Sequence, residues 1–253
     1  MISFLKNLIT RAGEMCLKEH NNLKISDVEF KNPKDLVTIT DKKVEAFIIR
    51  EITSRYPDHD ILGEETGRSG SSSRFLWIID PIDGTISFFH GQPFYAVSIA
   101  LEKDGELILG AVYAPVLGQL FHGEKGKGAF LNDVPIHVSD TKVLMDAVMA
   151  TGFACLRDGL THNNLIYFNT IVPKLRDIRR YGSAAIDLCY VACGKLDGFW
   201  EMNLNLYDIA AGVLIVKEAA GKVSDFLGCN EFPEKGIVAA NPDLHSQLTD
   251  MLG

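Results

Sequence analysis

The chain has 253 residues, of which 47% are hydrophobic and 23% charged, the composition of an ordinary globular protein rather than of a disordered or collagen-like chain. With 25 Lys and Arg against 33 Asp and Glu, the formal net charge is −8. This charge argues against general nucleic-acid binding and against an anionic membrane surface, since both need a positive face. No stretch of the sequence approaches the roughly 18 apolar residues that a membrane span requires.

The five cysteines form no Cys-x-x-Cys pair and are an odd number, a pattern typical of free thiols in a reducing cytoplasm. Cys189 and Cys193 lie one helical turn apart in an apolar run, without further soft ligands at a spacing that suits a metal. We expect both to be small core residues. Lys6 and Arg11 interrupt the N-terminal apolar residues, which argues against a secretory signal and favours a cytoplasmic protein.

Two amphipathic helices are predicted in the N-terminal part of the chain. Apolar residues recur at helical spacing over residues 2–18, and again from Asp41 to the residue before Pro57. A polar stretch around Pro33 separates the two patterns. Residues 63–74 are rich in Gly and Ser, and we expect them to form a flexible loop.

Strand patterns dominate the middle of the chain. Strands are predicted at residues 75–80, 94–101, 107–114, 119–122 and 129–131. Asp104-Gly105 and Asn132-Asp133 are turn signals. The segment Lys125-Gly-Lys-Gly128 lacks the spacing of a phosphate-binding loop, so it is also interpreted as a hairpin turn.

Helical and strand patterns are interspersed in the C-terminal part. Helices are predicted at residues 160–175, 183–193, 208–220 and 242–252, and strands at 197–202, 222–225 and 237–240. The meander in the middle third favours an α+β fold with antiparallel or mixed sheets over a regular βαβ alternation. A break near residues 140–150 is expected to divide an N-terminal subdomain, residues 1–145, from a C-terminal one, residues 146–253, within one compact unit.

Acidic residues gather at the edges of predicted elements. They are Asp41, the pair Glu64-Glu65, the segment Asp80-Pro-Ile-Asp83, and Asp208. Each has an ordinary alternative when it is taken singly. Asp41 and Asp208 could be helix N-caps, and Asp83 a turn or N-cap residue. Glu64 and Glu65 could be solvated surface residues.

The segment around Asp80 indicates a cation site beside an anion site. A predicted strand ends at Asp80, and Asp83 opens a tight turn at Gly84. The two carboxylates and the Ile82 carbonyl can offer hard oxygen ligands, which suit Mg²⁺. The backbone amides of Gly84 and Thr85 can bind an anion, as a helix N-terminus does. This combination points to a phosphorylated ligand.

Taken together, the motifs resemble the inositol monophosphatase family of Mg²⁺-dependent, Li⁺-sensitive sugar phosphatases, and in particular its bacterial inositol-1-monophosphatases. They are Asp35-x-Val-Thr-x-x-Asp41, Gly63-Glu-Glu65, Trp77-Ile-Ile-Asp-Pro-Ile-Asp-Gly-Thr85 and Tyr207-Asp-Ile-Ala-Ala-Gly212. The segments Arg180–Asp187 and Asp197–Met202 fit the same group. The resemblance implies a layered α-β-α-β-α sandwich, a homodimer, and two or three Mg²⁺ ions per subunit.

The resemblance also implies a role for each site residue. Glu64, Asp80 and the Ile82 carbonyl would hold one Mg²⁺, Asp80 with Asp83 and Asp208 a second, and a third would lie near Glu64. Asp41, Thr85 and Glu64 would be catalytic, with the pair Asp41 and Thr85 orienting or deprotonating the attacking water. Substrate contacts are implied for Asp83, Gly84, Thr85, Gly182, Ser183, Ala184, Glu201 and Asp208.

The implied activity is hydrolysis of inositol monophosphate, a small phosphorylated polyol. Fructose-1,6-bisphosphate and 3′-phosphoadenosine 5′-phosphate are alternative substrates, for which Arg176, Arg179 and Arg180 could reach a second phosphate or else form a solvated face. A non-catalytic partner in a transcription complex is an alternative of a different class. Where many relatives have Thr-Asn, this chain has Ile86-Ser87, and it has Tyr207 in place of a Trp. We expect these departures to reshape the substrate pocket without removing a metal ligand.

Overall fold

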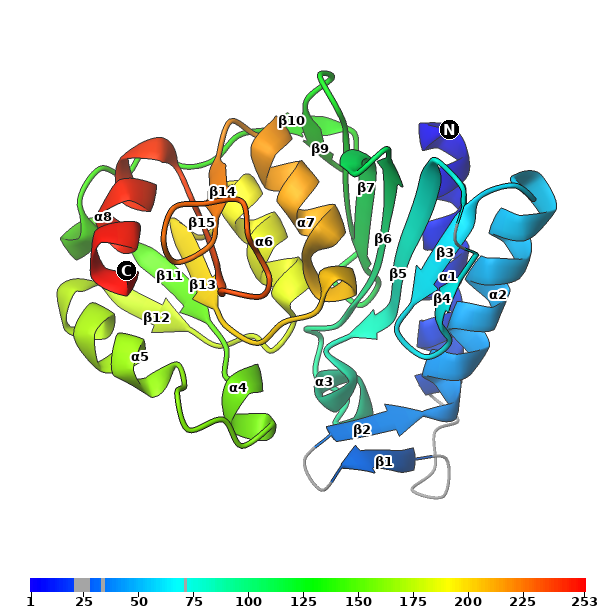
Figure 1. The fold of residues 1–253 in the computed structure, drawn as a ribbon, viewed down its shortest axis with the longest axis horizontal. Helices are drawn as coiled ribbons and strands as arrows, with labels where there is room; N and C mark the ends of the chain where they lie inside the picture. Colours follow the sequence, from blue (N-terminus) through cyan, green and yellow to red (C-terminus); the bar gives the residue numbers. More distant parts are fainter. Residues whose placement is uncertain (21–27, 33–34, 71) are drawn as a thin grey trace.

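The computed structural model describes residues 1–20, 28–32, 35–70 and 72–253, so that Pro33 lies outside the described residues. Helices and sheets alternate in layers, in the order helix, sheet, helix, sheet, helix (Figure 1). The α+β fold with mixed sheets that the sequence predicts is therefore confirmed. In the described part of the chain, no helix has both the length and the apolar character to cross a bilayer.

The outer helix layer on the N-terminal side consists of α1 (Ile2–His20) and α2 (Ile39–Arg55), which agree with the predicted ranges to within two residues. The buried face of α1 repeats at helical spacing, as expected for a helix that packs on a sheet. Its buried residues are Leu5, Leu8, Ile9, Ala12, Gly13 and Cys16. All of them except Gly13 share one core cluster with Trp77 and Ile79 from the first sheet.

The first sheet has eight strands in the order β10-β9-β8-β7-β6-β5-β3-β4. They are β3 (Asp60–Gly63), β4 (Gly67–Ser69), β5 (Phe75–Asp83), β6 (Ala96–Lys103), β7 (Glu106–Ala114), β8 (Gln119–Glu124), β9 (Ala129–Leu131) and β10 (Val134–Ile136). β3 and β5 run parallel, whereas the other pairs are antiparallel. The turns predicted at Asp104-Gly105 and Asn132-Asp133 are confirmed, and their positive φ angles suit tight hairpins.

The second sheet has five strands in the order β12-β11-β13-β15-β14. They are β11 (Val148–Thr151), β12 (Asp177–Arg179), β13 (Gly198–Glu201), β14 (Lys222–Ser224) and β15 (Ile237–Ala240). β11 is parallel to β12 and β13, and β15 is antiparallel to β13 and β14. The strands predicted at 197–202, 222–225 and 237–240 are confirmed.

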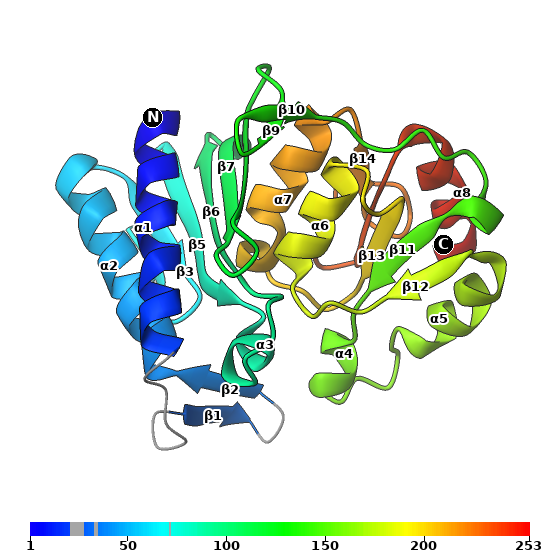
Figure 2. The same cartoon turned by 180° about the vertical axis from the view of Figure 1, so that it is seen from behind.

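The helices α6 (Ala184–Ala192) and α7 (Leu206–Glu218) lie between the two sheets (Figure 2). Every residue of α6 is buried, and all of them except Asp187 are apolar, as expected for a helix packed on all sides. A Cβ atom at Gly212 would lie 2.7 Å from the Cβ of Leu188. The two helices can therefore approach this closely only because residue 212 is glycine. The free thiol of Cys189 is fully buried, as predicted, and that of Cys193 is partly buried.

The outer layer on the C-terminal side contains α5 (Leu165–Ile171) and α8 (Pro242–Leu252). The helix predicted at 160–175 is shorter than expected, because a 3₁₀ turn with a proline, Val172–Lys174, follows α5. Shorter elements complete the fold: α3 (Thr85–Phe89), α4 (Ala154–Arg157) and a 3₁₀ turn at Leu144–Asp146.

The expectation of a flexible loop over residues 63–74 is wrong for its first part. Gly67–Ser69 forms β4, which pairs antiparallel with β3 across a tight turn. The polar stretch before the second helix also contains an antiparallel pair that the sequence did not indicate, β1 (Val28–Asn32) and β2 (Asp35–Thr38). These short strands carry too few residues for a period-two pattern to stand out.

Candidate metal centre

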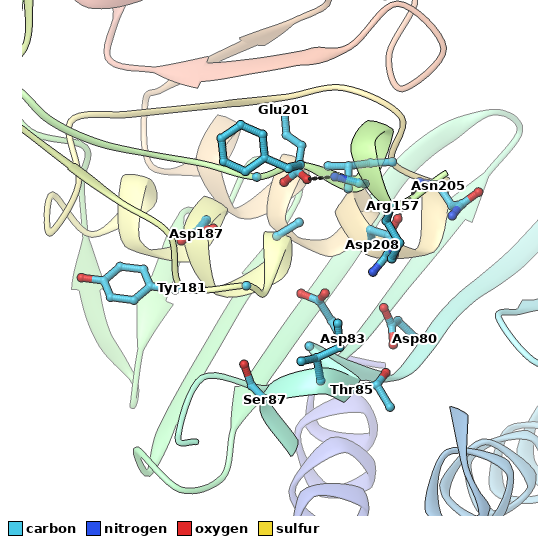
Figure 3. Close-up of a pocket in the computed structure, with 18 of the residues that line it drawn as sticks. Asp80, Asp83, Thr85, Ser87, Arg157, Tyr181, Asp187, Glu201, Asn205 and Asp208 are labelled. Atoms are coloured by element: carbon cyan, nitrogen blue, oxygen red, sulfur yellow. Dashed lines mark hydrogen bonds between the residues drawn. The ribbon is translucent and has the colours of Figure 1, made fainter. Parts of the chain in front are cut away.

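Carboxylates converge where β5 ends near the N-terminus of α7. One oxygen from each of Asp80, Asp83 and Asp208 lies within 4.8 Å of the others, and Figure 3 shows the three side chains around one space. In a regular strand, residues three apart face opposite sides. The pairing of β5 with β6 is irregular between Asp80 and Asp83, and such an irregularity re-aims a side chain. This allows both carboxylates to face Asp208.

Glu64 is brought to the same place by the parallel pairing of β3 and β5. The ends of parallel strands meet at one edge of the sheet, and the backbone N–H of Glu64, just after β3, donates to the Ile79 carbonyl at 3.2 Å. Its side chain is half-buried and lines the same cavity as Asp80. Glu64 is therefore not the solvated surface residue of the alternative interpretation.

A buried glutamate that the sequence analysis did not single out anchors the turn that carries Glu64. The carboxylate of Glu45, on α2, accepts the backbone N–H of Glu65 at 2.9 Å and that of Thr66 at 2.8 Å. Glu45 is fully buried. The available signal was a glutamate beside Val44 on the apolar face of a predicted helix, where an unpaired charge is costly.

Asp41 and Asp208 belong to capping boxes, each three residues after the true N-cap. Asp41 Oδ2 accepts the N–H of Thr38 at 2.8 Å, and Asp208 Oδ2 accepts the N–H of Asn205 at 2.6 Å. The N-cap alternative for the two aspartates is thus wrong in position, although both do stabilise helix starts. Because the caps hold the side chains in one orientation, they also position the carboxylates.

Thr85 lies between Asp41 and the end of β5. Its hydroxyl donates to the Ile82 carbonyl at 3.0 Å and lies 3.4 Å from Asp41 Oδ1. Gly84 precedes it with a φ of 90°, and a Cβ there would lie 2.8 Å from the Phe94 carbonyl oxygen. Only glycine fits this turn, which places the start of α3 beside the carboxylates.

Burial and mutual repulsion raise the pKa values of the clustered carboxylates. Burial, and then the neighbouring Glu64 and Asp83, raise the pKa of Asp80 well above its ordinary value. Burial and Asp83 do the same for the pKa of Asp208. Burial raises the pKa of Asp83 to about 6, against the hydrogen bond from Ser183. A divalent cation among these carboxylates would offset their repulsion and favour their ionised form. Ionised carboxylates are hard oxygen donors, so the residues fit Mg²⁺.

Asp41, which lies beside Thr85, and Glu201, which lines the cavity, both have raised pKa values. Burial raises the pKa of Asp41 to about 7, and that of Glu201 also to about 7. Hydrogen bonds to the two groups act in the opposite direction: Thr38 lowers the first pKa, and the Ala154 amide lowers the second.

The N-terminus of α6 forms the next wall. The hydroxyl of Ser183 donates to Asp83 Oδ2 at 2.6 Å, and the N–H of Ala185 donates to the same oxygen at 2.7 Å. Glu201, at the end of β13, accepts the N–H of Ala154 at 3.1 Å (Figure 3). A cavity of about 450 Å³ joins these walls to the carboxylate cluster, and both Gly182 and Ala184 line it.

Of the three arginines that were considered for a second phosphate, only one lines the cavity. Arg180 lines it. Arg176 forms an ion pair with Asp146, and Arg179 lies 2.6 Å from Asp177. The residues in which this chain departs from many relatives, Ile86, Ser87 and Tyr207, all line the cavity. Arg157 and Asp187 line it as well, and the sequence analysis had given neither a role.

The two mixed sheets and the buried carboxylates beside a polar cavity define a class: α+β proteins with a cluster able to hold a metal ion next to a small ligand. Within this class, the chain belongs to the inositol monophosphatase family, whose sequence profile matches residues 1–252.

Named relatives divide into two groups. The chain is 38% identical to an inositol-1-monophosphatase of Mesorhizobium japonicum, over 96% of this chain and 92% of the relative. It is 42% identical to the Nus factor SuhB of Pseudomonas aeruginosa, over 95% of this chain and 91% of the relative. The crystal structure of the extragenic suppressor protein suhB from Bartonella henselae superposes with a TM-score of 0.92 at 39% identity, covering 99% of this chain and 97% of that one.

Proposed function

We propose that this chain is a Mg²⁺-dependent phosphomonoesterase that hydrolyses inositol monophosphate to inositol and phosphate. The observation that carries the proposal is the convergence of Asp80, Asp83 and Asp208 beside a cavity of about 450 Å³, a size typical of small-ligand sites. Membership of the family and the 38% identity to an inositol-1-monophosphatase support the choice of reaction.

In this proposal the donors would hold two metal ions, and a third ion would lie nearby. Glu64, Asp80 and the Ile82 carbonyl would hold one ion, and Asp80, Asp83 and Asp208 a second, with a third near Glu64. Bound Mg²⁺ supplies neutralisation of the charge on the transferring phosphoryl group and a lowered pKa for water. Hydrolysis of a phosphate monoester depends on such positioning and charge neutralisation more than on covalent work by the protein.

The chain's own residues position the reactants. The hydroxyl of Thr85, within 3.4 Å of Asp41, would orient the attacking water and pass its proton towards that carboxylate. The N–H groups of Gly84 and Thr85, at the start of α3, would hold the phosphate. Glu201, together with the segment from Gly182 to Ala184, would contact the hydroxyls of the polyol.

A substrate panel with and without Mg²⁺ tests the proposal. Inositol 1-phosphate, fructose-1,6-bisphosphate and 3′-phosphoadenosine 5′-phosphate would be compared by kcat/KM. We expect inositol 1-phosphate to be turned over most efficiently, since Arg180 lines the cavity whereas Arg176 and Arg179 are held in ion pairs. Turnover of another substrate at least tenfold more efficiently would refute the inositol assignment. Lack of any Mg²⁺-dependent turnover would refute the reaction.

A role in a transcription complex is the second candidate, favoured by the 42% identity to a protein named Nus factor SuhB. Asp83→Asn and Asp208→Asn separate the two roles, because both are expected to abolish Mg²⁺-dependent hydrolysis. If either variant, expressed in a strain that lacks the gene, restores the wild-type phenotype, the binding role is primary. The proposal also includes a homodimer, which sedimentation equilibrium would test.

A further inference from the structure

A buried carboxylate in the cavity lacks the hydrogen bonds that such a group needs. Asp187 lies in the first turn of α6, and 2% of its surface is exposed. Its Oδ1 atom is buried and has no hydrogen-bond partner among the residues that the structure describes. A buried acceptor without a donor is costly. Because Asp187 lines the cavity, a rotation of its carboxylate would let a bound ligand supply the missing donor.

Asp187 lies in a different part of the cavity from the carboxylates assigned to the metals. Figure 3 shows it near Tyr181, with Asp83 between it and Asp80 in that view. The charges that act on it most strongly are those of Glu201 and Asp83, with Arg180 opposing them. Asp187 therefore belongs to the end of the cavity where the non-phosphorylated part of a substrate would lie.

A purely structural role explains the position of Asp187 only in part. An acid in the first turn of a helix interacts favourably with the helix dipole. However, the cap of α6 is provided by Ser183, whose hydroxyl accepts the N–H of Ile186 at 3.2 Å. The side chain of Asp187 is thus not needed to satisfy the start of the helix, and the residue lines the same cavity as Glu201.

We propose that Asp187 accepts a hydrogen bond from a ring hydroxyl of the substrate, remote from the phosphate, and so selects polyol phosphates over phosphate esters that lack hydroxyls. This inference rests on the proposed function and adds a specificity residue to it. A site built to pair with a substrate hydroxyl discriminates strongly against an analogue without it, because the protein group is then left unpaired. Because a buried acceptor left without a donor is costly, the expected discrimination is about 10- to 100-fold.

The test compares the ratio of kcat/KM for inositol 1-phosphate to that for p-nitrophenyl phosphate, with saturating Mg²⁺. Asp187→Ala removes the acceptor, whereas Asp187→Asn keeps a neutral acceptor of the same size. We expect the ratio to fall about 10- to 100-fold in the alanine variant and by a smaller factor in the asparagine variant. Urea unfolding of both variants provides a readout of the fold. Removal of an unsatisfied carboxylate should not lower their midpoints.

Asp225 provides a matched control. It is fully buried, and its Oδ2 also has no partner in the described part of the chain, but it does not line the cavity. Asp225→Asn should leave the substrate ratio within twofold of the wild-type value. A set of monodeoxy inositol 1-phosphates then identifies the hydroxyl: one deletion should lower wild-type kcat/KM by the same factor and have no further effect in Asp187→Ala.

The outcomes separate this inference from the function on which it rests. If the wild type does not hydrolyse inositol 1-phosphate or other polyol phosphates, both proposals are wrong. If it does, and Asp187→Ala leaves the ratio within twofold, only the role of Asp187 is refuted. Equal losses with both substrates would likewise refute it, because they indicate a general disturbance of the site.

Discussion

Asp208→Asn should stabilise the metal-free protein at alkaline pH while it abolishes the stabilising effect of Mg²⁺. Asp208 is one of three carboxylates whose oxygens lie within 4.8 Å of one another, and it also caps α7 by accepting the Asn205 N–H at 2.6 Å. Asparagine removes the charge but keeps an acceptor for the cap. The substitution therefore isolates the electrostatic contribution.

The magnitude follows from the separation of the charges. Two unit charges about 5 Å apart interact with roughly 3 kcal/mol at an effective dielectric constant of 20, and Asp208 has two such neighbours. Protonation limits this repulsion. Because burial and Asp83 raise the pKa of Asp208, the folded protein binds this proton more tightly than the unfolded chain does. The stability that results is complete below about pH 4 and is lost as the pH rises through the raised pKa.

We therefore expect Asp208→Asn to raise the free energy of unfolding by about 2–4 kcal/mol at pH 8 and by less than about 1 kcal/mol at pH 5. The assay is urea unfolding with EDTA at the two pH values, repeated with millimolar Mg²⁺. The wild type should gain stability from Mg²⁺, and the variant should not. Asp208→Ala, which also loses the cap acceptor, should be about 1 kcal/mol less stable than Asp208→Asn.

Asp243→Asn is the matched control, since Asp243 is an exposed acid in the first turn of α8, outside the cluster. It should change stability by less than about 0.5 kcal/mol at either pH. The reasoning would be refuted if Asp208→Asn were less stable than the wild type in EDTA at pH 8, or if its effect did not depend on pH.

Three further predictions concern the turn of Glu64, the helix pair and the metal positions. Glu45→Gln places an NH₂ group against one of the two backbone N–H groups that the carboxylate accepts, so half-maximal activation should need about tenfold more Mg²⁺. Mg²⁺ titrations followed by activity and by thermal unfolding measure this concentration. An unchanged midpoint in both titrations would contradict the prediction. Gly212→Ala places a Cβ 2.7 Å from that of Leu188 and should cost about 1–3 kcal/mol in urea unfolding; a neutral result would mean that the helices separate freely. Li⁺ at tens of millimolar should inhibit hydrolysis by occupying a metal position, and steady-state rates that do not respond to it would count against the family-based assignment.

The elements that the sequence predicted best carry their own local signal. The apolar spacing of α1 and the Asp104-Gly105 turn need no distant partner to be recognised. β11 (Val148–Thr151) and β12 (Asp177–Arg179) were missed because they are short and become strands only by pairing with each other and with β13. Secondary structure of this kind is decided by tertiary contacts, which no local pattern records.

The residues of the candidate site also differ in whether a local sequence motif reveals them. Asp80 and Asp83 could be predicted because one continuous motif contains both, and their convergence with Asp208 is what the motifs led us to expect. Glu45 and Asp187 escaped notice because their importance depends on what the fold places beside them, two backbone amides in one case and an open wall in the other. The assignments of metals and catalytic roles to individual residues stay predictions.

The two hydrogen bonds between Asp83 and the start of α6 bear on when the proposed metal site can form during folding. Asp83 Oδ2 accepts from Ser183 and Ala185, residues of a helix that lies between the sheets, while Asp208 comes from the helix beside it. A nascent chain that has completed only its first sheet lacks Asp208 and this clasp. If the proposed site binds a cation, binding should therefore come late in folding, and the cation would stabilise the completed fold without directing its assembly.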